Sequence, residues 1–329
     1  MAVEKRVLLI SPDFFNYSQI IKSAMEKKGY IVDWFSDRNG VSFMKKALLR
    51  VKKSALKSSI DKYLKKIRKF AANYDYEYVV VVNGEVLTVE FVESLKKDHA
   101  DAEFVLYMWD SLKNFSDSEK LLPCFDKCFS FDKNDCETHE ALEFLPLFYY
   151  LDDGYTDFVN AEKVYDYAFI GTVKKGKFGE IKKITDNLDE RYDKSFKYLY
   201  LQSRLVYLYY KFKYRQEFKD AKMSMFRYKR LSTKRCNEIG LRAKIIVDVP
   251  MKDQNGLTIR TFEILSRGQK LITSNANIRD YDFFDSDQVY VYDGNEIDFS
   301  AEFFEDRLCE ENTEIKKYHI DNWLTALMA

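Results

Sequence analysis

The 329-residue sequence predicts an α/β protein built from two doubly wound parallel sheets. Short β-rich runs alternate with longer amphipathic stretches, the pattern of right-handed β–α–β units. The runs at residues 78–82 and 245–249 are apolar on both faces, as in strands covered by helices on both sides. The alternation occurs twice, with a polar, turn-prone segment at residues 151–157 between the two series. We therefore expect an N-terminal domain over residues 1–152 and a C-terminal domain over residues 153–329, facing each other across a cleft.

Strands and helices follow one another in the same order in both series. In the first series, strands are expected at residues 7–10, 30–35, 78–82, 104–108 and 128–131. In the second series, they are expected at residues 167–170, 198–201, 244–249, 270–273 and 289–292. Each run is short and rich in β-branched or aromatic side chains, a composition that favours strands over helices.

Two of the intervening helical stretches have distinctive patterns. Residues 41–73 carry apolar side chains at three- and four-residue spacing, which predicts a long basic helix bent near Ser58 and Ser59. Its apolar stripe suits packing on the sheet, and its lysine face suits either solvent or an anionic membrane surface. The stripe comprises Met44, Leu48, Val51, Ala55, Ile60, Leu64, Ile67 and Ala71. Residues 299–329 also have a helical pattern, and their apolar side chains need a partner surface, so we expect a C-terminal helix that packs back on the fold.

The net charge is zero, with 53 basic and 53 acidic residues, but the charges are segregated along the chain. Residues 204–235 contain eleven Lys or Arg against two acids, interleaved with aromatic side chains. This mixture suits a lipid interface, an acceptor groove or, least well, nucleic acid, because no nucleic-acid-binding motif accompanies it. No uncharged run exceeds eight residues, and the five cysteines are irregularly spaced. We expect a cytoplasmic protein without an N-terminal signal peptide, whose membrane contact is at most peripheral.

Several apparent motifs fail when their spacing is checked. Residues 171–177 match the first seven positions of a P-loop, but Phe178 stands where a Ser or Thr would ligate magnesium. This loop is either a phosphate-binding turn or a solvated basic turn. Cys124, Cys128, Cys136 and His139 have the residue types of a zinc site, but their spacing favours buried structural cysteines. The Asp-x-Asp pairs at 280–282 and 285–287 are interpreted as solvated turns, so no metal or other cofactor is expected.

The most informative stretch lies at residues 248–263, followed by the apolar run at 270–274. It predicts a buried strand, a polar loop ending in Gly256, a helix opening at Leu257 and Thr258, and a further strand. The start of such a helix presents unpaired N–H groups and a positive dipole end, which suit a phosphate. Glu263 falls within the next two turns, where its carboxylate could accept hydrogen bonds from sugar hydroxyls. An ordinary strand–loop–helix unit is the alternative interpretation.

Several segments together carry a resemblance to a known family. They are Phe-Ile-Gly-Thr at 169–172, Asp-x-Pro-x₃-Gln-x-Gly-Leu-Thr-x-Arg-Thr-x-Glu at 248–263 and Lys-Leu-Ile-Thr-x-Asn at 270–275, with weaker segments at 107–111, 130–132 and 144–148. In these segments the chain resembles the CgeB-like group of GT-B glycosyltransferases, which are common in bacterial capsule, exopolysaccharide and lipopolysaccharide gene clusters. The resemblance spans most of the chain and is densest over residues 165–293. It implies the GT-B architecture, two Rossmann-like domains, with a nucleotide-activated sugar bound mainly by the C-terminal half.

The resemblance also implies roles for individual residues. Glu263 would bind the donor ribose, and Arg260 and Lys177 would neutralise the phosphates as the leaving group develops charge. The residues implied to form the rest of the donor site are Gly171, Thr172, Gln254, Gly256, Leu257 and Thr258. Two structural alternatives stay open, because Arg260 could simply pair with an aspartate and Thr258 could simply cap the helix.

One departure from the family pattern bears on the mechanism. Many retaining GT-B enzymes carry two glutamates seven residues apart, and Asn255 stands at the earlier position here. The broken pair favours an inverting transfer, which needs a general base to deprotonate the acceptor hydroxyl. Such a base is expected on a loop after a strand of the N-terminal domain. Asp110 is the first candidate, Glu85 the second and Asp13 the third, and each could instead be only a helix cap or turn former.

The sequence therefore predicts a metal-independent glycosyltransferase that moves a sugar from a nucleoside diphosphate donor to a surface glycan, which could be lipid-linked. Its expected partners are the nucleotide-sugar, the glycan acceptor and, peripherally, the inner face of the cytoplasmic membrane, with no nucleic acid. The alternative from another class is a non-catalytic glycan- or nucleotide-binding protein on the same fold within a polysaccharide assembly machine. A membrane scaffold is disfavoured because it leaves residues 256–263 without a purpose.

Overall fold

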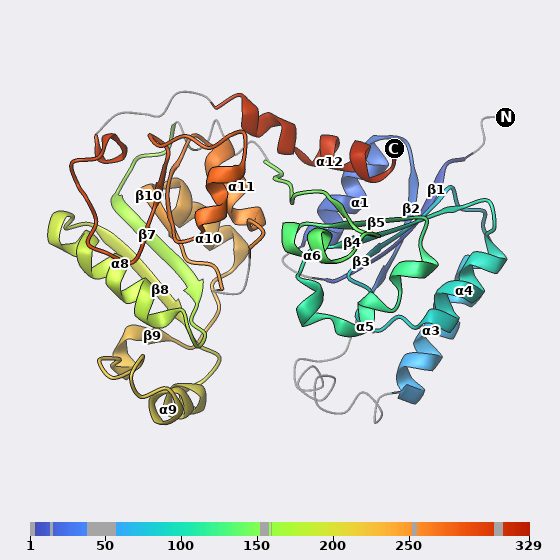
Figure 1. Ribbon diagram of the computed structural model, residues 1–329, viewed down its shortest axis with the longest axis horizontal. Coiled ribbons are helices and arrows are strands. Elements are labelled where there is room, and N and C mark those ends of the chain that lie inside the picture. Colours follow the sequence, from blue (N-terminus) through green and yellow to red (C-terminus); the bar gives the residue numbers. More distant parts are fainter. Residues whose placement is uncertain are drawn as a thin grey trace. The chain divides into compact units, whose positions relative to one another are not determined.

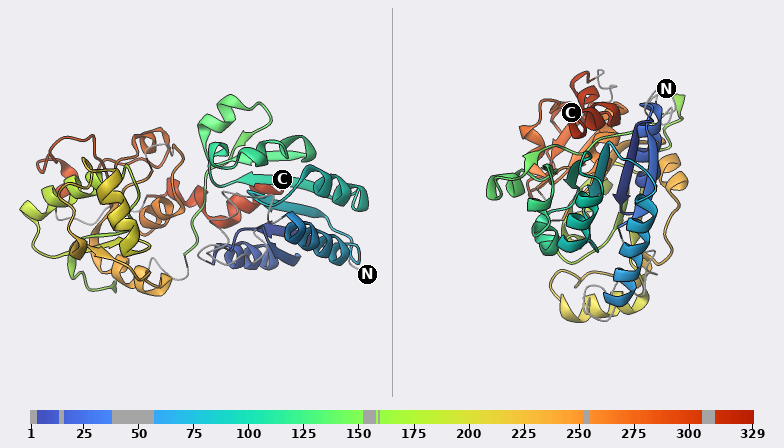
Figure 2. Two further views of the ribbon diagram at one scale, coloured as in Figure 1. Left: turned by 90° about the horizontal axis from the view of Figure 1, so that it is seen from below. Right: turned by 90° about the vertical axis from the view of Figure 1, so that its right-hand side faces the viewer.

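The computed structural model describes residues 4–13, 16–37, 57–151, 158, 160–251, 255–305 and 312–329. The chain divides into two compact units. Unit 1 comprises Met1–Leu147 together with Ile320–Ala329, and unit 2 comprises Phe148–His319. The sequence placed the boundary at residues 152 and 153 and gave the last ten residues to the C-terminal domain, whereas in the structure they belong to unit 1. Figure 2 shows these last residues in red, among the blue and green elements of unit 1.

Unit 1 is built on a six-stranded parallel sheet with the order β2-β1-β3-β4-β5-β6. Its strands are β1 (Arg6–Ser11), β2 (Ile31–Ser36), β3 (Tyr78–Val82), β4 (Glu103–Met108), β5 (Lys127–Ser130) and β6 (Glu143–Phe144). Its helices are α1 (Tyr17–Lys27), α3 (Lys57–Ala71), α4 (Val89–Asp98), α5 (Ser116–Glu119), α6 (Lys133–Thr138) and α12 (Ile320–Leu327), with 3-10 turns η2 (Leu112–Asn114) and η3 (Leu122–Cys124). Figure 1 shows these elements from blue to green, with α12 in red.

Unit 2 repeats the plan with the strand order β12-β11-β10-β7-β8-β9, again entirely parallel. Its strands are β7 (Tyr165–Thr172), β8 (Ser195–Tyr200), β9 (Phe226–Arg227), β10 (Ala243–Asp248), β11 (Lys270–Thr273) and β12 (Val289–Val291). Its helices are α8 (Phe178–Arg191), α9 (Arg204–Lys213), α10 (Thr233–Leu241) and α11 (Ile259–Ser266). Its 3-10 turns are η4 (Met223–Met225), η5 (Ala276–Asp280), η6 (Glu302–Phe304) and η7 (Glu314–Tyr318).

The predicted α/β class with two doubly wound parallel sheets is confirmed, and all ten predicted strands are present. The sequence missed β6 and β9, which have two residues each and are too short to leave a periodic pattern. The helical pattern at residues 299–329 corresponds to two 3-10 turns and the eight-residue α12 among the described residues, not to one long helix. Residues 41–56 of the predicted basic helix lie outside the described residues, and its second half is α3.

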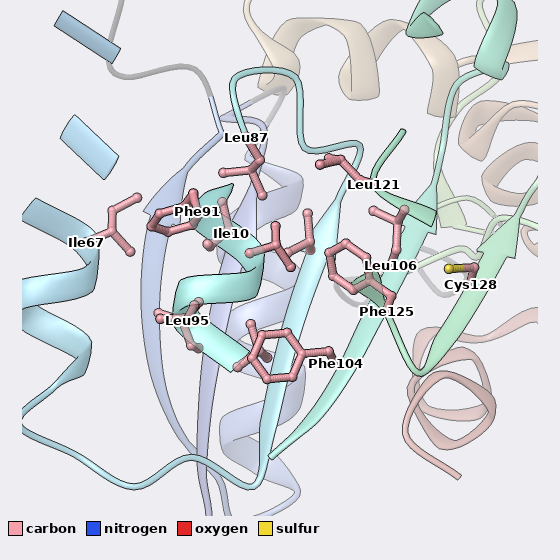
Figure 3. Packing of buried hydrophobic residues seen from close by; sticks show 14 of the residues in the cluster. Ile10, Ile67, Leu87, Phe91, Leu95, Phe104, Leu106, Leu121, Phe125 and Cys128 are labelled. Atoms are coloured by element: carbon pink, nitrogen blue, oxygen red, sulfur yellow. The ribbon is translucent and has the colours of Figure 1, made fainter. Parts of the chain in front are cut away.

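Both faces of the unit 1 sheet are covered, as the apolar strands required, because the successive residues Val79 to Val82 of β3 are all buried. Alternate strand residues pack against the stripe of α3 and against α4, and this cluster is shown in Figure 3. The α3 stripe of Ile60, Leu64, Ile67 and Ala71 is buried there, which confirms packing as its purpose. Cys128 is buried in the same cluster, and Cys124 and Cys136 pack against it, as the structural interpretation of these cysteines required.

The predicted packing of the C-terminal helix on the fold is also confirmed. Helix α12 contacts α1, and the Trp323 ring meets Tyr107 edge-on at 4.9 Å between ring centroids. The hydroxyl of Tyr78 donates to the carbonyl of Met328 at 2.9 Å, and Lys28 Nζ donates to Thr325 Oγ1 at 2.9 Å. Within the described residues, no helix has both the length and the apolar character needed to cross a membrane.

Candidate functional site

The C-terminal candidates gather at one edge of the unit 2 sheet. The strand order reverses between β7 and β10, and the crevice outside the carboxyl ends of strands at such a reversal is where doubly wound sheets bind ligands. Gly171 and Thr172 end β7, and Lys177 directly precedes α8. Gly256, Leu257 and Thr258 connect β10 to α11, which carries Arg260 and Glu263. Gln254 lies outside the described residues.

Helix α11 begins at Thr258, which the structure uses as a cap. The Thr261 N–H donates to Thr258 Oγ1 at 3.3 Å, and the Thr258 hydroxyl donates to Asp248 Oδ2 at 3.3 Å. The capping interpretation of Thr258 is therefore correct, and its hydroxyl already has a partner. Asp248 ends β10, so this pair joins the end of the strand to the start of the helix.

Arg260 crosses from α11 to the neighbouring strand. Its Nη1 donates to the backbone carbonyl of Ile170, next to the end of β7. This bond spans the strand reversal and holds a guanidinium at the carboxyl edge of the sheet. Glu263 follows Arg260 by three residues, so both side chains lie on the same side of α11, and Glu263 is half-buried.

A second cation, Lys177, lies near Arg260. Burial lowers the pKa of the Lys177 ammonium below its ordinary value, the Asp248 carboxylate opposes the shift, and Lys174 and Arg260 add to it. Lys177 is thus close enough to two other cations, and to the carboxylates of Asp248 and Glu180, for their charges to act on it. Such a group favours a bound anion, because an anion restores the charged form that burial and the like charges disfavour.

Two asparagines hold the loop that precedes α11. Asn275 Nδ2 donates to the carbonyls of Asn255 and Gly256 at 3.2 and 3.5 Å, and Asn277 Nδ2 donates to the Asn255 carbonyl at 3.1 Å. Asn275 is itself oriented by the Asn277 N–H, which donates to its Oδ1 at 3.2 Å. The segment after β11 therefore fixes the backbone at the mouth of α11.

The loop at residues 171–177 differs from its phosphate-binding interpretation. The carboxylate of Glu217 accepts hydrogen bonds from the Gly176 N–H and the Phe178 N–H, both at 2.9 Å. These are the donors that a phosphate would use at the start of α8, so in this structure a carboxylate of the chain occupies that position. The contribution of the loop to the site is therefore its cations, Lys174 and Lys177, rather than these two amides.

Gly171 has a packing role in addition to its place at the edge. A Cβ added there would lie 2.8 Å from Cζ of the Phe169 ring, which is buried. Residues 169 and 171 face the same side of β7, so glycine leaves room for the ring.

The three N-terminal candidates follow three adjacent strands of the unit 1 sheet. Asp13 follows β1, Glu85 follows β3 and Asp110 follows β4, so all three lie along one carboxyl edge. Asp13 is exposed, whereas Glu85 and Asp110 are half-buried. Asp110 Oδ1 accepts hydrogen bonds from the Ser111 N–H at 3.0 Å and from Asn114 Nδ2 at 2.9 Å. These bonds orient the carboxylate by one oxygen, and Oδ2 takes no donor from the described residues.

Sequence reasoning missed two residues that organise this edge. Asn83 adopts φ 61°, accepts the Trp109 N–H on Oδ1 at 3.0 Å, and accepts the Ser118 hydroxyl on its carbonyl at 2.8 Å. Asp135 accepts the Leu112 N–H on Oδ2 at 2.9 Å. The signal for Asn83 was present as an Asn-Gly pair directly after a strand, a pair that favours positive φ. Asp135 had no local signal, because its partner lies 23 residues away.

Across the described residues, no group of three or more His, Cys, Asp or Glu side chains has the arrangement of a metal site. Asp282, from one of the Asp-x-Asp pairs, accepts hydrogen bonds from Lys317 Nζ at 2.9 Å and from the Tyr318 hydroxyl at 2.8 Å. It serves as a tether for η7 in unit 2.

Several solved structures share this two-sheet architecture. No protein-family profile and no curated protein matches the sequence. Among solved structures, an α,α-trehalose-phosphate synthase (UDP-forming) from Burkholderia vietnamiensis aligns with a TM-score of 0.60 over 98% of both chains, at 9% identity. The chain has the GT-B fold.

Two further GT-B structures align with nearly the whole length of this chain. The lipopolysaccharide outer core galactosyltransferase WaaB aligns with a TM-score of 0.57 over 97% of both chains, at 9% identity. Anabaena HepE, in complex with UDP and glucose, aligns with a TM-score of 0.56 over 98% of both chains, at 9% identity. The predicted GT-B architecture is therefore confirmed, and at these identities the likeness concerns the fold.

Proposed function

We propose that this chain is a glycosyltransferase that moves a sugar from a nucleoside diphosphate donor to a glycan acceptor. The observation that carries the proposal is the gathering of Lys177, Arg260 and the start of α11 at the strand reversal of the unit 2 sheet. These groups suit a diphosphate, whose negative charge grows as the sugar departs. Among the GT-B neighbours, Anabaena HepE was solved in complex with UDP and glucose and the trehalose-phosphate synthase is UDP-forming, so UDP-sugars are the first donors to test.

Each residue has a chemical role in this proposal. Glu263 accepts hydrogen bonds from the ribose hydroxyls of the donor, and the N–H groups at the mouth of α11 bind the diphosphate. Lys177 and Arg260 stabilise the departing diphosphate without a metal ion. The loop at Asn255 and Gly256, fixed by Asn275, positions those N–H groups.

We propose an inverting transfer with Asp110 as the general base. Asn255 replaces the first glutamate of the retaining pair, and Asp110 has a carboxylate held by one oxygen with the other available for a proton. Glu85 and Asp13 are the second and third choices along the same edge. The CgeB-like assignment, a bacterial surface polysaccharide as product, a cytoplasmic location and peripheral membrane contact belong to the same proposal.

Donor turnover measured in parallel with binding tests the proposal. The chain is incubated with each UDP-, GDP-, ADP- and dTDP-sugar, with and without EDTA, and release of free nucleotide is measured, with and without glycan acceptors. We expect one donor to be consumed, unaffected by EDTA, and Asp110→Asn to lower kcat at least 100-fold with donor affinity unchanged. Tight nucleotide binding without turnover on any acceptor would instead support the non-catalytic alternative. An unchanged kcat in Asp110→Asn would transfer the role to Glu85 or Asp13.

A further inference from the structure

Helix α9 carries a row of apolar side chains that face solvent. Leu205, Leu208, Tyr209 and Phe212 are 76%, 52%, 49% and 71% exposed, and we call them the α9 apolar face. Their spacing of three and four residues places them on one side of the helix. Elsewhere among the described residues, no large apolar side chain is more than 38% exposed. An apolar row of this exposure marks a contact surface.

The helix itself is firmly anchored, so the exposure does not come from a loosely attached segment. Its other side buries Tyr207, whose hydroxyl donates to the Ala221 carbonyl at 3.0 Å. The hydroxyl of Ser203 caps the helix by accepting the Val206 N–H at 3.2 Å. Lys211 Nζ donates to three carbonyls of the following segment at 2.7 to 3.0 Å. The anchored side holds the α9 apolar face outward.

Cations surround the α9 apolar face. In residues 204–222, six Lys or Arg stand against two acids. One of these acids, Glu217, is already bound to the Gly176 and Phe178 N–H groups. Lys213 lies over the Tyr209 ring at 5.3 Å and Arg215 lies over the Phe212 ring at 4.9 Å, both measured to the ring centroid. Arg204, Lys219 and Lys222 are further exposed cations of the same segment. The surroundings of the face therefore complement an anionic surface.

We propose that the α9 apolar face docks on an anionic lipid membrane, with Leu205, Leu208 and Phe212 inserted at the boundary of headgroups and acyl chains. Basic amphipathic helices with exposed Leu and Phe bind membranes in this manner. The face offers about 500 Å² if a fully exposed side chain of this size offers roughly 200 Å², less than the roughly 800 Å² per partner of a standard protein interface. A small apolar protein contact would leave the flanking cations without opposite charges, whereas anionic lipid headgroups supply them.

The structure also distinguishes between the two basic stretches of the sequence. The apolar stripe of α3 is buried in the unit 1 core, so the described part of that helix has no apolar row that could insert into a membrane. Helix α9 has both the row and the cations. It follows β8, so it begins at the carboxyl edge of the unit 2 sheet, the edge that carries Lys177 and Arg260, and Figure 1 shows it beyond the arrow tips of that sheet.

Docking gives the peripheral membrane contact of the proposed function a named surface, but it concerns only that surface and a lipid, so it can be measured without donor or acceptor. Its consequence for catalysis does rest on the proposed function: a membrane against α9 would present a lipid-linked acceptor near the donor edge of the sheet. Vesicle binding is therefore measured in the absence of donor, so that failure of one proposal is distinguishable from failure of the other.

Sedimentation of the full chain with vesicles tests the inference. Vesicles of phosphatidylcholine alone and of phosphatidylcholine with 30% phosphatidylglycerol are compared at 0.05 and 0.5 M NaCl. We expect binding to the anionic vesicles at low salt and at least tenfold weaker binding at high salt. The double variant Leu205→Ser and Phe212→Ser should bind at least tenfold more weakly, whereas Ile31→Ser, an exposed aliphatic residue of unit 1, should bind like the wild type.

A charge variant completes the test. Lys213→Glu with Lys219→Glu should weaken binding about 25-fold or more, since each basic residue near the lipid contributes about fivefold. The matched change on α3, Lys65→Glu with Lys66→Glu, alters the total charge equally and should have little effect. Absence of binding to anionic vesicles would overturn the proposal, and so would stronger loss from the α3 pair. A wild-type dimer that becomes monomeric in the Leu205 and Phe212 variant would also overturn it, by showing a second copy as the occupant.

Discussion

The carboxylate of Glu217 at the start of α8 gives the sharpest test of how unit 2 is held together. It accepts two backbone N–H groups, those of Gly176 and Phe178, each at 2.9 Å. Glu217→Ala removes both acceptors and the negative charge that favours the helix start. The following residue, Phe218, is buried against Phe178 with ring centroids 4.8 Å apart, so the same connection also packs on α8.

The expected loss of stability in Glu217→Ala follows from these two hydrogen bonds. A hydrogen bond to a charged group contributes about 1.5–3 kcal/mol net, and water reaches this half-buried carboxylate, so we expect Glu217→Ala to lower the free energy of unfolding by about 2–4 kcal/mol. For a unit of this size the change corresponds to a fall in Tm of roughly 5–15 °C. Glu217→Gln keeps one neutral acceptor, so its loss should be about half as large.

The assay is thermal and urea unfolding followed by circular dichroism, with Glu238→Ala as the control. Glu238 forms an exposed ion pair with Arg235 in the same unit, and its removal should cost less than about 1 kcal/mol. Sulfate should restore part of the stability of Glu217→Ala, because the vacated amides can bind an anion. Equal stabilities of Glu217→Ala and Glu238→Ala would show that the two hydrogen bonds of Glu217 contribute no more than a surface ion pair.

Three further predictions concern other parts of the chain. Burial raises the pKa of the Cys136 thiol to about 11, so at pH 8 iodoacetamide should label it about 200-fold more slowly than a free cysteine of pKa about 8.5. The labelling rate, followed by peptide mapping, should rise about tenfold between pH 8 and pH 9, and fast labelling at pH 8 would contradict this. Trp323→Ala removes a buried ring from its contact with Tyr107 and should cost about 3–5 kcal/mol in urea unfolding, whereas exposed Thr325→Ala should cost little. Gly171→Ala forces the buried Phe169 ring to move and should cost about 1–3 kcal/mol; wild-type stability would show that the ring adapts freely.

Much of the fold could be predicted from the sequence, because parallel strands buried on both faces leave long apolar runs. The strands β3 and β11 were predicted to the residue. The strands β6 and β9 could not be, since two residues carry no periodicity, and β6 is also exposed. The sequence could not show which unit α12 joins, because apolar side chains such as Trp323 could pack on any apolar surface of either unit.

The candidate site was predictable where its residues lie close together in sequence. Thr258 as a cap and the opening of α11 follow from local rules, and both are present. The partners of Arg260 and Glu217 were not predictable, because Ile170 lies 90 residues from Arg260 and Gly176 lies 41 residues from Glu217. In a charge-rich stretch such as residues 204–235, nothing local separates the carboxylate that binds a helix start from those that face solvent.

We expect the strand reversal in unit 2 to bind a nucleoside diphosphate through Lys177 and its neighbours. This binding is measured by calorimetric titration of the chain with UDP, GDP, ADP and dTDP, with and without EDTA. The variant Lys177→Met and the control Lys182→Met are titrated alongside. Lys182 lies on α8 and forms an exposed ion pair with Asp186, so its loss leaves the edge of the sheet intact. We predict that one nucleotide binds regardless of EDTA, that Lys177→Met weakens binding at least tenfold, and that Lys182→Met does not. Failure of all four nucleotides to bind, or equal affinities in the two lysine variants, would show that this edge of the sheet is not a nucleotide site held by Lys177.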